Sequence, residues 1–110
     1  MRLTTSCDMG SIKIFNKGMS CFFMNDWGDG TNTVHITKKS KICGCRVDKL
    51  PKKYKHNKFL GHFTVKNKAW LSDYDCEDSP LYEFDKGRWF VYLLKPREFH
   101  IEKVDNDIHA

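Results

Sequence analysis

A run of cationic side chains in the middle of the chain has the clearest chemical meaning. The stretch from Lys38 to Lys58, called the basic segment below, holds nine Lys or Arg residues and one acid, Asp48. It carries about +8, whereas the whole chain carries +5, so the other 89 residues are net acidic. Charge concentrated in this way is costly to collect in a compact fold, and it is typical of a surface that meets a polyanion or an acidic protein.

Most of these cations are lysines, which suit the neutralisation of phosphate better than the reading of a base edge. We therefore expect any nucleic-acid binding to follow the backbone, to weaken steeply with salt and to depend little on sequence. Tyr54 and His56 lie inside the run and could stack on bases. The residues expected to contact nucleic acid or a partner are Lys38, Lys39, Lys41, Arg46, Lys49, Lys52, Lys53, Tyr54, Lys55 and Lys58.

The sequence leaves three interpretations of the basic segment open. It binds nucleic acid, it binds an acidic protein surface, or it is a solvated loop that keeps a small protein in solution. The chain also holds an internal counterpart, because the stretch Asp73–Asp85 contains six acids and no base. This acidic stretch could instead contact a partner of its own, with carboxylates in the place of phosphates.

Two matching tripeptides form a second constellation. His35-Ile-Thr37 and His62-Phe-Thr64 both read His-x-Thr within strand patterns, so each His shares a strand face with its Thr. The pair resembles the motifs of the two-histidine phosphoesterase family. This resemblance covers six residues and implies that one His acts as base and the other as acid on a phosphodiester, while each hydroxyl holds phosphate oxygens. In this chain 27 residues separate the histidines, and two ordinary strand histidines are the alternative.

The five cysteines are an odd number, which predicts free thiols rather than a disulfide framework. Cys43 and Cys45 could supply two thiolates to a metal, with His56, His62 or Cys76 completing the set. Structural zinc sites usually use two Cys-x2–4-Cys doublets. This chain has one Cys-x-Cys and no second doublet, so we expect no metal and no cofactor.

Oxygen ligands crowd one loop, where Asn25, Asp26, Asp29 and Asn32 lie close together in sequence. Calcium binding is conceivable there, but the loop lacks the spacing and the terminal Glu of an EF-hand. The simpler interpretation is a Gly-rich turn between two strands of a hairpin.

The elements that must position these residues are mainly strands. An alternative at Ser79-Pro80 is one short helix, since Ser is a good N-cap and Pro suits the first helical position. Turns every 8–12 residues favour a small antiparallel barrel or sandwich of about seven short strands. The fold would then be all-β, or α+β with the helix. Strands are predicted at residues 11–15, 19–24, 31–37, 60–65, 69–71, 81–84, 89–94 and 99–104.

A chain of 110 residues predicts a single domain, 1–110, with the basic segment as a loop at 38–58. Its start has no apolar core of a secretory signal, and its longest apolar run, Trp89–Leu94, is far below the ~20 residues of a membrane span. We therefore expect a cytoplasmic protein without membrane contact. The expected core is Ile12, Ile14, Phe22, Val34, Ile36, Phe63, Val65, Trp70, Phe90, Tyr92, Leu94 and Ile101.

These features point to binding rather than catalysis. In general character the short, aromatic-rich and highly charged chain is similar to small accessory proteins of tailed bacteriophages, which often bind a host or defence component. We therefore expect a viral binding protein, an inhibitor of counter-defence or host-takeover type, whose basic segment engages a protein or nucleoprotein partner. The alternatives are a protein that binds the RNA or DNA backbone and a phosphodiesterase that uses His35 and His62.

Overall fold

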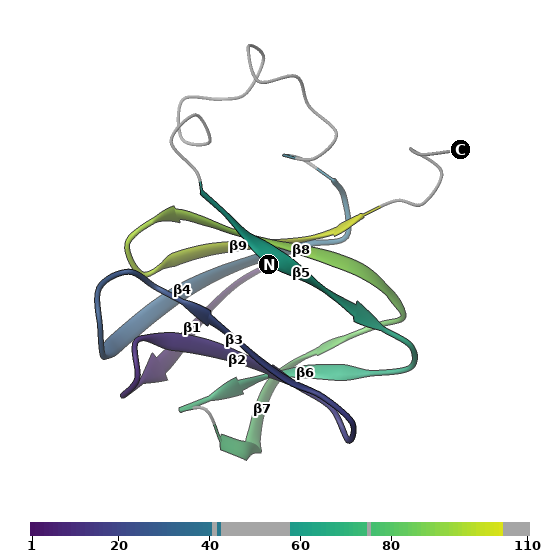
Figure 1. Cartoon of the computed structure of the whole chain (residues 1–110), viewed down its shortest axis with the longest axis horizontal. Coiled ribbons are helices and arrows are strands. Elements are labelled where there is room, and N and C mark those ends of the chain that lie inside the picture. Colours follow the sequence, from purple (N-terminus) through teal and green to yellow (C-terminus); the bar gives the residue numbers. More distant parts are fainter. Residues whose placement is uncertain (41, 43–57, 75, 105–110) are drawn as a thin grey trace.

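The structure is a computed structural model that describes residues 1–40, 42, 58–74 and 76–104. These residues form nine β-strands in two sheets, and no helix occurs among them (Figure 1). No part of the described chain therefore offers a helix long and apolar enough to cross a membrane. The prediction of an all-β fold is confirmed.

Sheet A has five strands in the order β1, β4, β9, β8, β5. Neighbouring strands are antiparallel except β4 and β9, which run parallel, with Val34 beside Phe99. This pair differs from the purely antiparallel expectation, because strands distant in sequence can meet in either direction once the chain crosses between sheets. The bounds are β1 Arg2–Cys7, β4 Gly30–Thr37, β5 Lys58–Val65, β8 Gly87–Lys95 and β9 Glu98–Val104.

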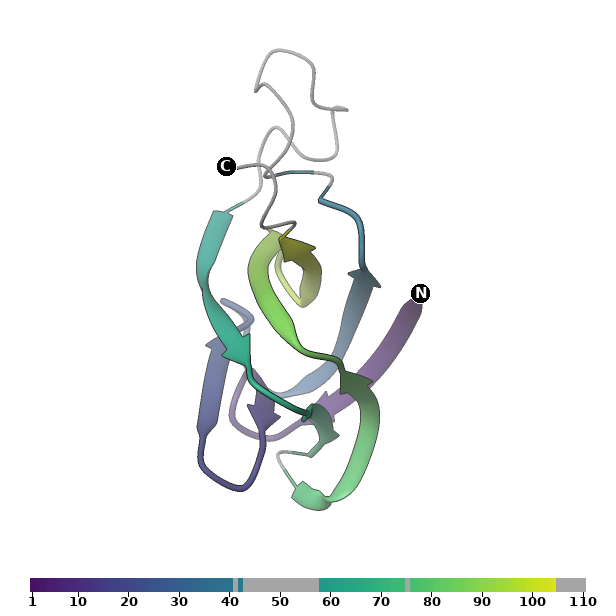
Figure 2. The ribbon, with the colours of Figure 1, turned by 90° about the vertical axis from the view of Figure 1, so that its right-hand side faces the viewer.

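Sheet B has four antiparallel strands in the order β3, β2, β6, β7. The turned view of Figure 2 shows the strands of both sheets curving around a shared interior. Two layers that pack their apolar faces together form a sandwich, which is one of the two predicted architectures. The bounds are β2 Ser11–Phe15, β3 Ser20–Met24, β6 Ala69–Asp73 and β7 Cys76–Phe84.

Two strands differ from the prediction. β1 was not expected, because its inward positions Leu3, Thr5 and Cys7 include only one strongly apolar residue. The short helix at Ser79-Pro80 is wrong, since both residues lie within β7. β7 is the last strand of sheet B and its register shifts near Pro80, and an edge strand or an irregularity is where a sheet tolerates proline.

The core lies between the two sheets and is rich in aromatic rings. Phe84 lies 5.1 Å from Phe63 and 5.0 Å from Trp89, measured between ring centroids, and all three rings are buried. Trp89 also donates its Nε1–H to the carbonyl of Asp85 at 3.1 Å. Large buried rings of this kind contribute most of the apolar surface that holds a small sandwich together.

The predicted core is correct for residues in alternating runs and wrong for several in continuous apolar runs. Ile12, Ile14, Val34, Ile36, Phe63, Val65 and Ile101 are buried between the sheets. Phe22, by contrast, is 52% exposed and Phe23 is buried in its place. Trp70, Phe90 and Leu94 are only partly buried. Tyr92 is buried, but in a separate small cluster with Ile42 rather than between the sheets. The inward residues that the prediction missed are Phe23, Ala69, Leu71, Phe84, Trp89, Val91, Leu93 and Phe99.

The loop between β3 and β4 crosses from sheet B to sheet A, so the hairpin predicted around it is wrong. Asn25 organises this loop. Its Oδ1 accepts hydrogen bonds from the backbone N–H groups of Trp27 at 2.8 Å and Gly28 at 2.9 Å, and its amide donates to Asn32 Oδ1 at 2.8 Å. Both asparagines are fully buried. Two of the four candidate calcium ligands thus use their side-chain oxygens within the fold.

The aromatic core gives a first prediction. We expect Phe84→Ala to lower the free energy of unfolding by about 3–5 kcal/mol, because it removes a ring that contacts both sheets and leaves a cavity. Phe22→Ala is the matched control, since Phe22 is 52% exposed, and its cost should stay near or below 1 kcal/mol. Urea unfolding of the two variants measures both losses, and equal losses would contradict the inward placement of Phe84.

Candidate binding surface on the outer face of sheet A

The face of sheet A that points away from the core carries both His-x-Thr motifs. β4 places His35 and Thr37 there, and β5 places His62 and Thr64 there, while Val34, Ile36, Phe63 and Val65 alternate with them into the core. The basic segment leaves β4 at Lys38 and enters β5 at Lys58. A single face therefore positions most of the candidate residues that the structure describes.

The structure does not bring the two histidines together. β9 and β8 lie between β4 and β5, which separates His35 from His62 by three strand spacings, or about 14 Å. Glu102 of β9 and Phe90 of β8 stand between Thr37 and His62 in the same row of the sheet. Two strands thus stand between these histidines, whereas a base and an acid that act on one phosphodiester must both reach the reacting atoms at hydrogen-bond distance.

Each histidine has a local contact instead. His35 Nε2 lies 3.0 Å from Glu98 Oε1, and Lys95 Nζ lies 3.2 Å from Glu98 Oε2. Burial by itself would raise the pKa of Glu98, but hydrogen bonds from Lys95 and His35 outweigh it and lower that pKa. His62 is exposed, with its ring 6.1 Å from that of Phe90. Both are ordinary strand histidines in their described contacts.

A buried polar pair on this face was not predicted. His100 Nε2 lies 2.8 Å from Glu102 Oε1, and the side chains are 4% and 0% exposed. The same Glu102 oxygen accepts the backbone N–H of Ile42 at 2.9 Å, and Ile42 packs with Tyr92 in a small cluster outside sheet A. A buried carboxylate needs such partners. The available signal was the alternation around Ile101, which places His100 and Glu102 together on the face opposite the core.

The described start of the basic segment is therefore anchored to sheet A. Besides the amide of Ile42, the hydroxyl of Ser40 donates to the backbone carbonyl of Lys103 at 2.8 Å. Lys38 and Lys39, just before these anchors, are exposed. The chain thus leaves β4 in a defined position with its first cations in solvent.

The described cations of the basic segment make only exposed ion pairs. Lys38 Nζ and Lys103 Nζ lie 3.2 and 3.3 Å from the carboxylate oxygens of Asp85. Burial acts to raise the pKa of Asp85, but the hydrogen bonds and charges of these two lysines lower it overall. Lys58 Nζ lies 3.3 Å from Asp26 Oδ2. Such pairs contribute little to stability.

The acidic stretch is distributed over several partners rather than reserved for the basic segment. Glu77 pairs with Lys13 at 3.5 Å and Glu83 with Lys68 at 3.6 Å, and both of these lysines lie outside the basic segment. Within the described residues, Asp85 is the acid of this stretch that reaches the segment, through Lys38. The acidic stretch therefore acts as an internal partner of the basic segment in one described contact, Lys38–Asp85.

The remaining predicted contact residues lie outside the described residues. They are Lys41, Arg46, Lys49, Lys52, Lys53, Tyr54 and Lys55, and the same is true of the candidate thiolates Cys43 and Cys45. Cys7, Cys21 and Cys76 carry free thiols. In the ranges that the structure describes, no three His, Cys, Asp or Glu side chains are grouped as metal ligands would be.

No protein-family model, curated protein or solved structure matches this chain. Its chemistry must therefore be inferred from its own residues.

The cluster around Glu98 gives a pH-dependence prediction. The pKa of Glu98 is lower in the folded protein than its ordinary value of 4.5, so its ionisation stabilises the fold above about pH 5 and this stabilisation is lost as pH falls. We expect Glu98→Gln to lower the free energy of unfolding at pH 7 by less than about 1 kcal/mol, and the difference from wild type to shrink toward pH 3.

Urea unfolding at several pH values, down to the lowest at which the protein stays folded, checks this prediction. Glu77→Gln is the control, because the Glu77 side chain is 56% exposed and should contribute little at any pH. A gap between wild type and Glu98→Gln that stays constant or widens on acidification would contradict the prediction.

Proposed function

We propose that the protein works by binding, and that its basic segment engages a protein or nucleoprotein partner that presents concentrated negative charge. The observation that carries the proposal is a charge of about +8 on residues 38–58 in a chain whose other residues are net acidic. Charge held together against its own repulsion is stabilised by an anionic partner. In the role expected of a bacteriophage accessory protein, that partner is a host or defence component.

The attachment of the segment to sheet A supports the proposal. Two strands of one hydrogen-bonded sheet hold its ends, and the anchor at Ile42 holds its start. Binding residues are often found on segments that a rigid scaffold positions in this way. Lys38, Lys39 and Lys58 are exposed at these ends, so cations of the segment reach solvent where it joins the sheet.

The chemistry of the cations supports an extended acidic surface rather than a small ligand. Lysine is a hydrated point charge on a flexible stem, which follows a field of carboxylates or phosphates without needing one fixed geometry. The exposed pairs Lys38–Asp85 and Lys58–Asp26 can be exchanged for a partner's anionic groups at little cost. Such a surface raises the rate of association and makes it sensitive to salt.

The second candidate function is binding of the nucleic-acid backbone by the same segment. It is favoured by the predominance of lysine and by Tyr54 within the run. Duplex DNA and polyglutamate are two defined polyanions, one of phosphates and one of carboxylates, and their relative affinity separates the two candidates.

The test is a binding titration of the full chain with labelled duplex DNA and labelled polyglutamate over a range of salt concentrations. We expect Lys52→Ala with Lys53→Ala to weaken binding to the preferred polymer. For DNA, the slope of log affinity against log salt should fall by about 2, since each neutralised phosphate contributes about 0.9. The matched control is Arg2→Ala with Lys95→Ala, which removes the same charge elsewhere and should keep the wild-type slope.

Two results would overturn the proposal. One is a wild-type protein that binds neither polymer at low salt. The other is a control variant that weakens binding as much as the segment variant does, because binding would then depend on net charge and not on the basic segment.

A further inference from the structure

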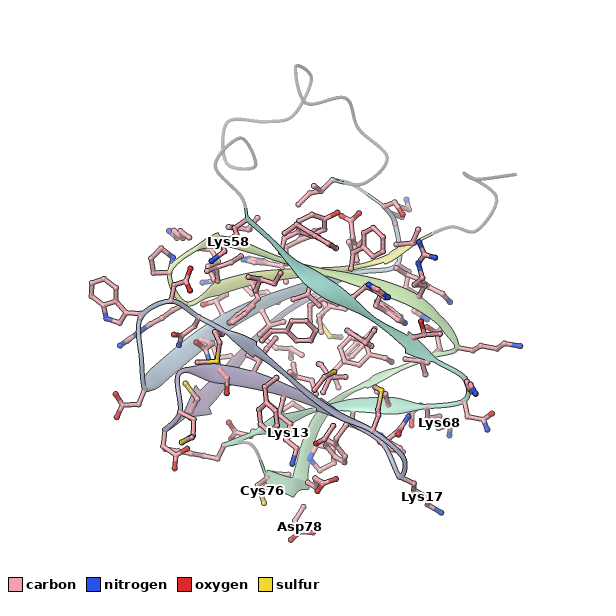
Figure 3. All side chains as sticks on the ribbon, in the orientation of Figure 1. Lys13, Lys17, Lys58, Lys68, Cys76 and Asp78 are labelled. Carbon is pink, nitrogen blue, oxygen red and sulfur yellow. The ribbon has the colours of Figure 1, made fainter. Side chains whose placement is uncertain are left out.

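Three turns that are distant in sequence meet at one end of the sandwich and bring five exposed cations with them. The β2–β3 turn contributes Lys17, and the β5–β6 turn contributes Lys66 and Lys68. The β7–β8 turn contributes Lys86, and Arg88 follows at the start of β8. In Figure 3, Lys17 and Lys68 lie on the same side of the view, and Lys58 lies on the opposite side. This group of five is called the basic end below.

Two adjoining hollows lie between these turns. The first has a volume of about 550 Å³ and is lined by Lys17, Lys66, Lys68 and Trp70, with Asn16 and Asn67 between them. The second has a volume of about 520 Å³ and is lined by Thr64, Lys66, Lys86 and Arg88. Lys66 lines both hollows, so they adjoin at this side chain, and together they are called the cationic track.

Most of this positive charge is not neutralised within the described part of the protein. Lys68 has an exposed ion pair with Glu83 at 3.6 Å. Lys17, Lys66 and Lys86 form no ion pair with any described residue. The nearest acid to Lys86 in sequence is Asp85, whose carboxylate already binds Lys38 and Lys103. A site with several free ammonium groups favours a ligand that carries several anionic groups.

Trp70 gives the first hollow an aromatic surface. It lies on the outer face of sheet B, partly exposed, and its ring is 5.8 Å from the buried ring of Phe15 on the neighbouring strand. This contact holds the indole in place before any ligand arrives, so little side-chain entropy is lost on binding. A fixed aromatic ring beside lysines is the combination that stacks a base and neutralises its phosphate.

We propose that the basic end is a binding site for single-stranded nucleic acid. One base stacks on Trp70 in the first hollow, and its phosphates lie against Lys17, Lys66 and Lys68. The strand continues past Lys66 to Lys86 and Arg88 in the second hollow. A duplex does not fit this arrangement, because its base faces are stacked on one another and cannot cover an indole.

This inference goes beyond the proposed function, because it uses none of the residues of the basic segment. The second hollow favours a strand over a free nucleotide, since it adds cations without adding a second aromatic surface. A strand and a free nucleotide both offer a base with phosphate, and competition by a mononucleotide distinguishes them.

The test measures binding of the full chain to a labelled single-stranded oligonucleotide by fluorescence anisotropy. The oligonucleotide is about 12 nucleotides long, which is within the usual range of such sites. The same oligonucleotide as a duplex and an unlabelled mononucleotide as competitor complete the set. We expect Trp70→Ala to weaken single-strand binding roughly tenfold to hundredfold, with little effect on duplex binding. Trp70→Phe should restore most of the affinity, because a phenyl ring can still stack.

Trp27→Ala is the matched control for the loss of an indole, since Trp27 is 69% exposed on another loop, and it should bind like wild type. Lys66→Ala tests the cationic track without touching the core. It should lower the salt slope for the single strand by about 0.7, the contribution of one phosphate contact. The charge-matched control is Lys95→Ala.

The proposal is overturned if Trp70→Ala and Lys66→Ala both bind the single strand like wild type. It is also overturned if Trp70→Ala weakens single-strand and duplex binding equally, or if the mononucleotide competes as well as the oligonucleotide. In a background that carries Lys52→Ala and Lys53→Ala, the Trp70→Ala change should still weaken single-strand binding by the same factor. If only the proposal for the basic segment fails, the Lys52 and Lys53 changes have no effect while Trp70→Ala still weakens single-strand binding. If only the proposal for the basic end fails, the reverse is observed.

Discussion

The contact between Phe63, Phe84 and Trp89 is the packing interaction on which the rest of the molecule depends. Phe84 comes from sheet B and the other two rings come from sheet A, so their edge-to-face contacts at 5.0 and 5.1 Å join the two layers. The β5–β6 and β7–β8 turns both cross between the sheets directly beyond these rings. Because the rings fix the distance between the sheets there, they also fix how closely Lys66, Lys68 and Lys86 approach one another.

Strand β8 shows a second constraint, since it is apolar toward both sides of sheet A. Trp89, Val91 and Leu93 face the core, while Tyr92 packs with Ile42 in the cluster on the other face. A strand covered on both faces needs apolar residues at every position. The neighbouring strand β9 is also covered on its outer face, but there it buries the hydrogen-bonded pair His100–Glu102. A polar group can be buried in such a place only with a partner.

The two cationic surfaces arise in different ways, although both suit anionic partners. The basic segment is a local concentration of charge in the sequence, held at its start by Ile42 and Ser40. The basic end is assembled from three turns and has an aromatic surface at Trp70. The first suits an extended acidic surface, and the second suits a strand with free bases. A nucleoprotein presents both kinds of group, so the two proposed sites are compatible with each other.

The sequence by itself determined what depends on neighbouring residues: the all-β class, the positions of most strands and turns, the inward residues of alternating strands and the concentration of lysine at 38–58. These follow from a period of two and from local turn chemistry, which are properties of short stretches. Only the tertiary structure decided which residues of Phe22-Phe23 and of Trp89–Leu94 point inward. In a continuous apolar run, either set of alternate residues could face the core.

The tertiary structure also decided that β3 and β4 lie in different sheets, that His35 and His62 stand three strands apart, and that Lys17, Lys66 and Lys86 share one end. These outcomes depend on which strands pair across long separations in sequence. That choice is made by the packing of the whole core rather than by any local pattern.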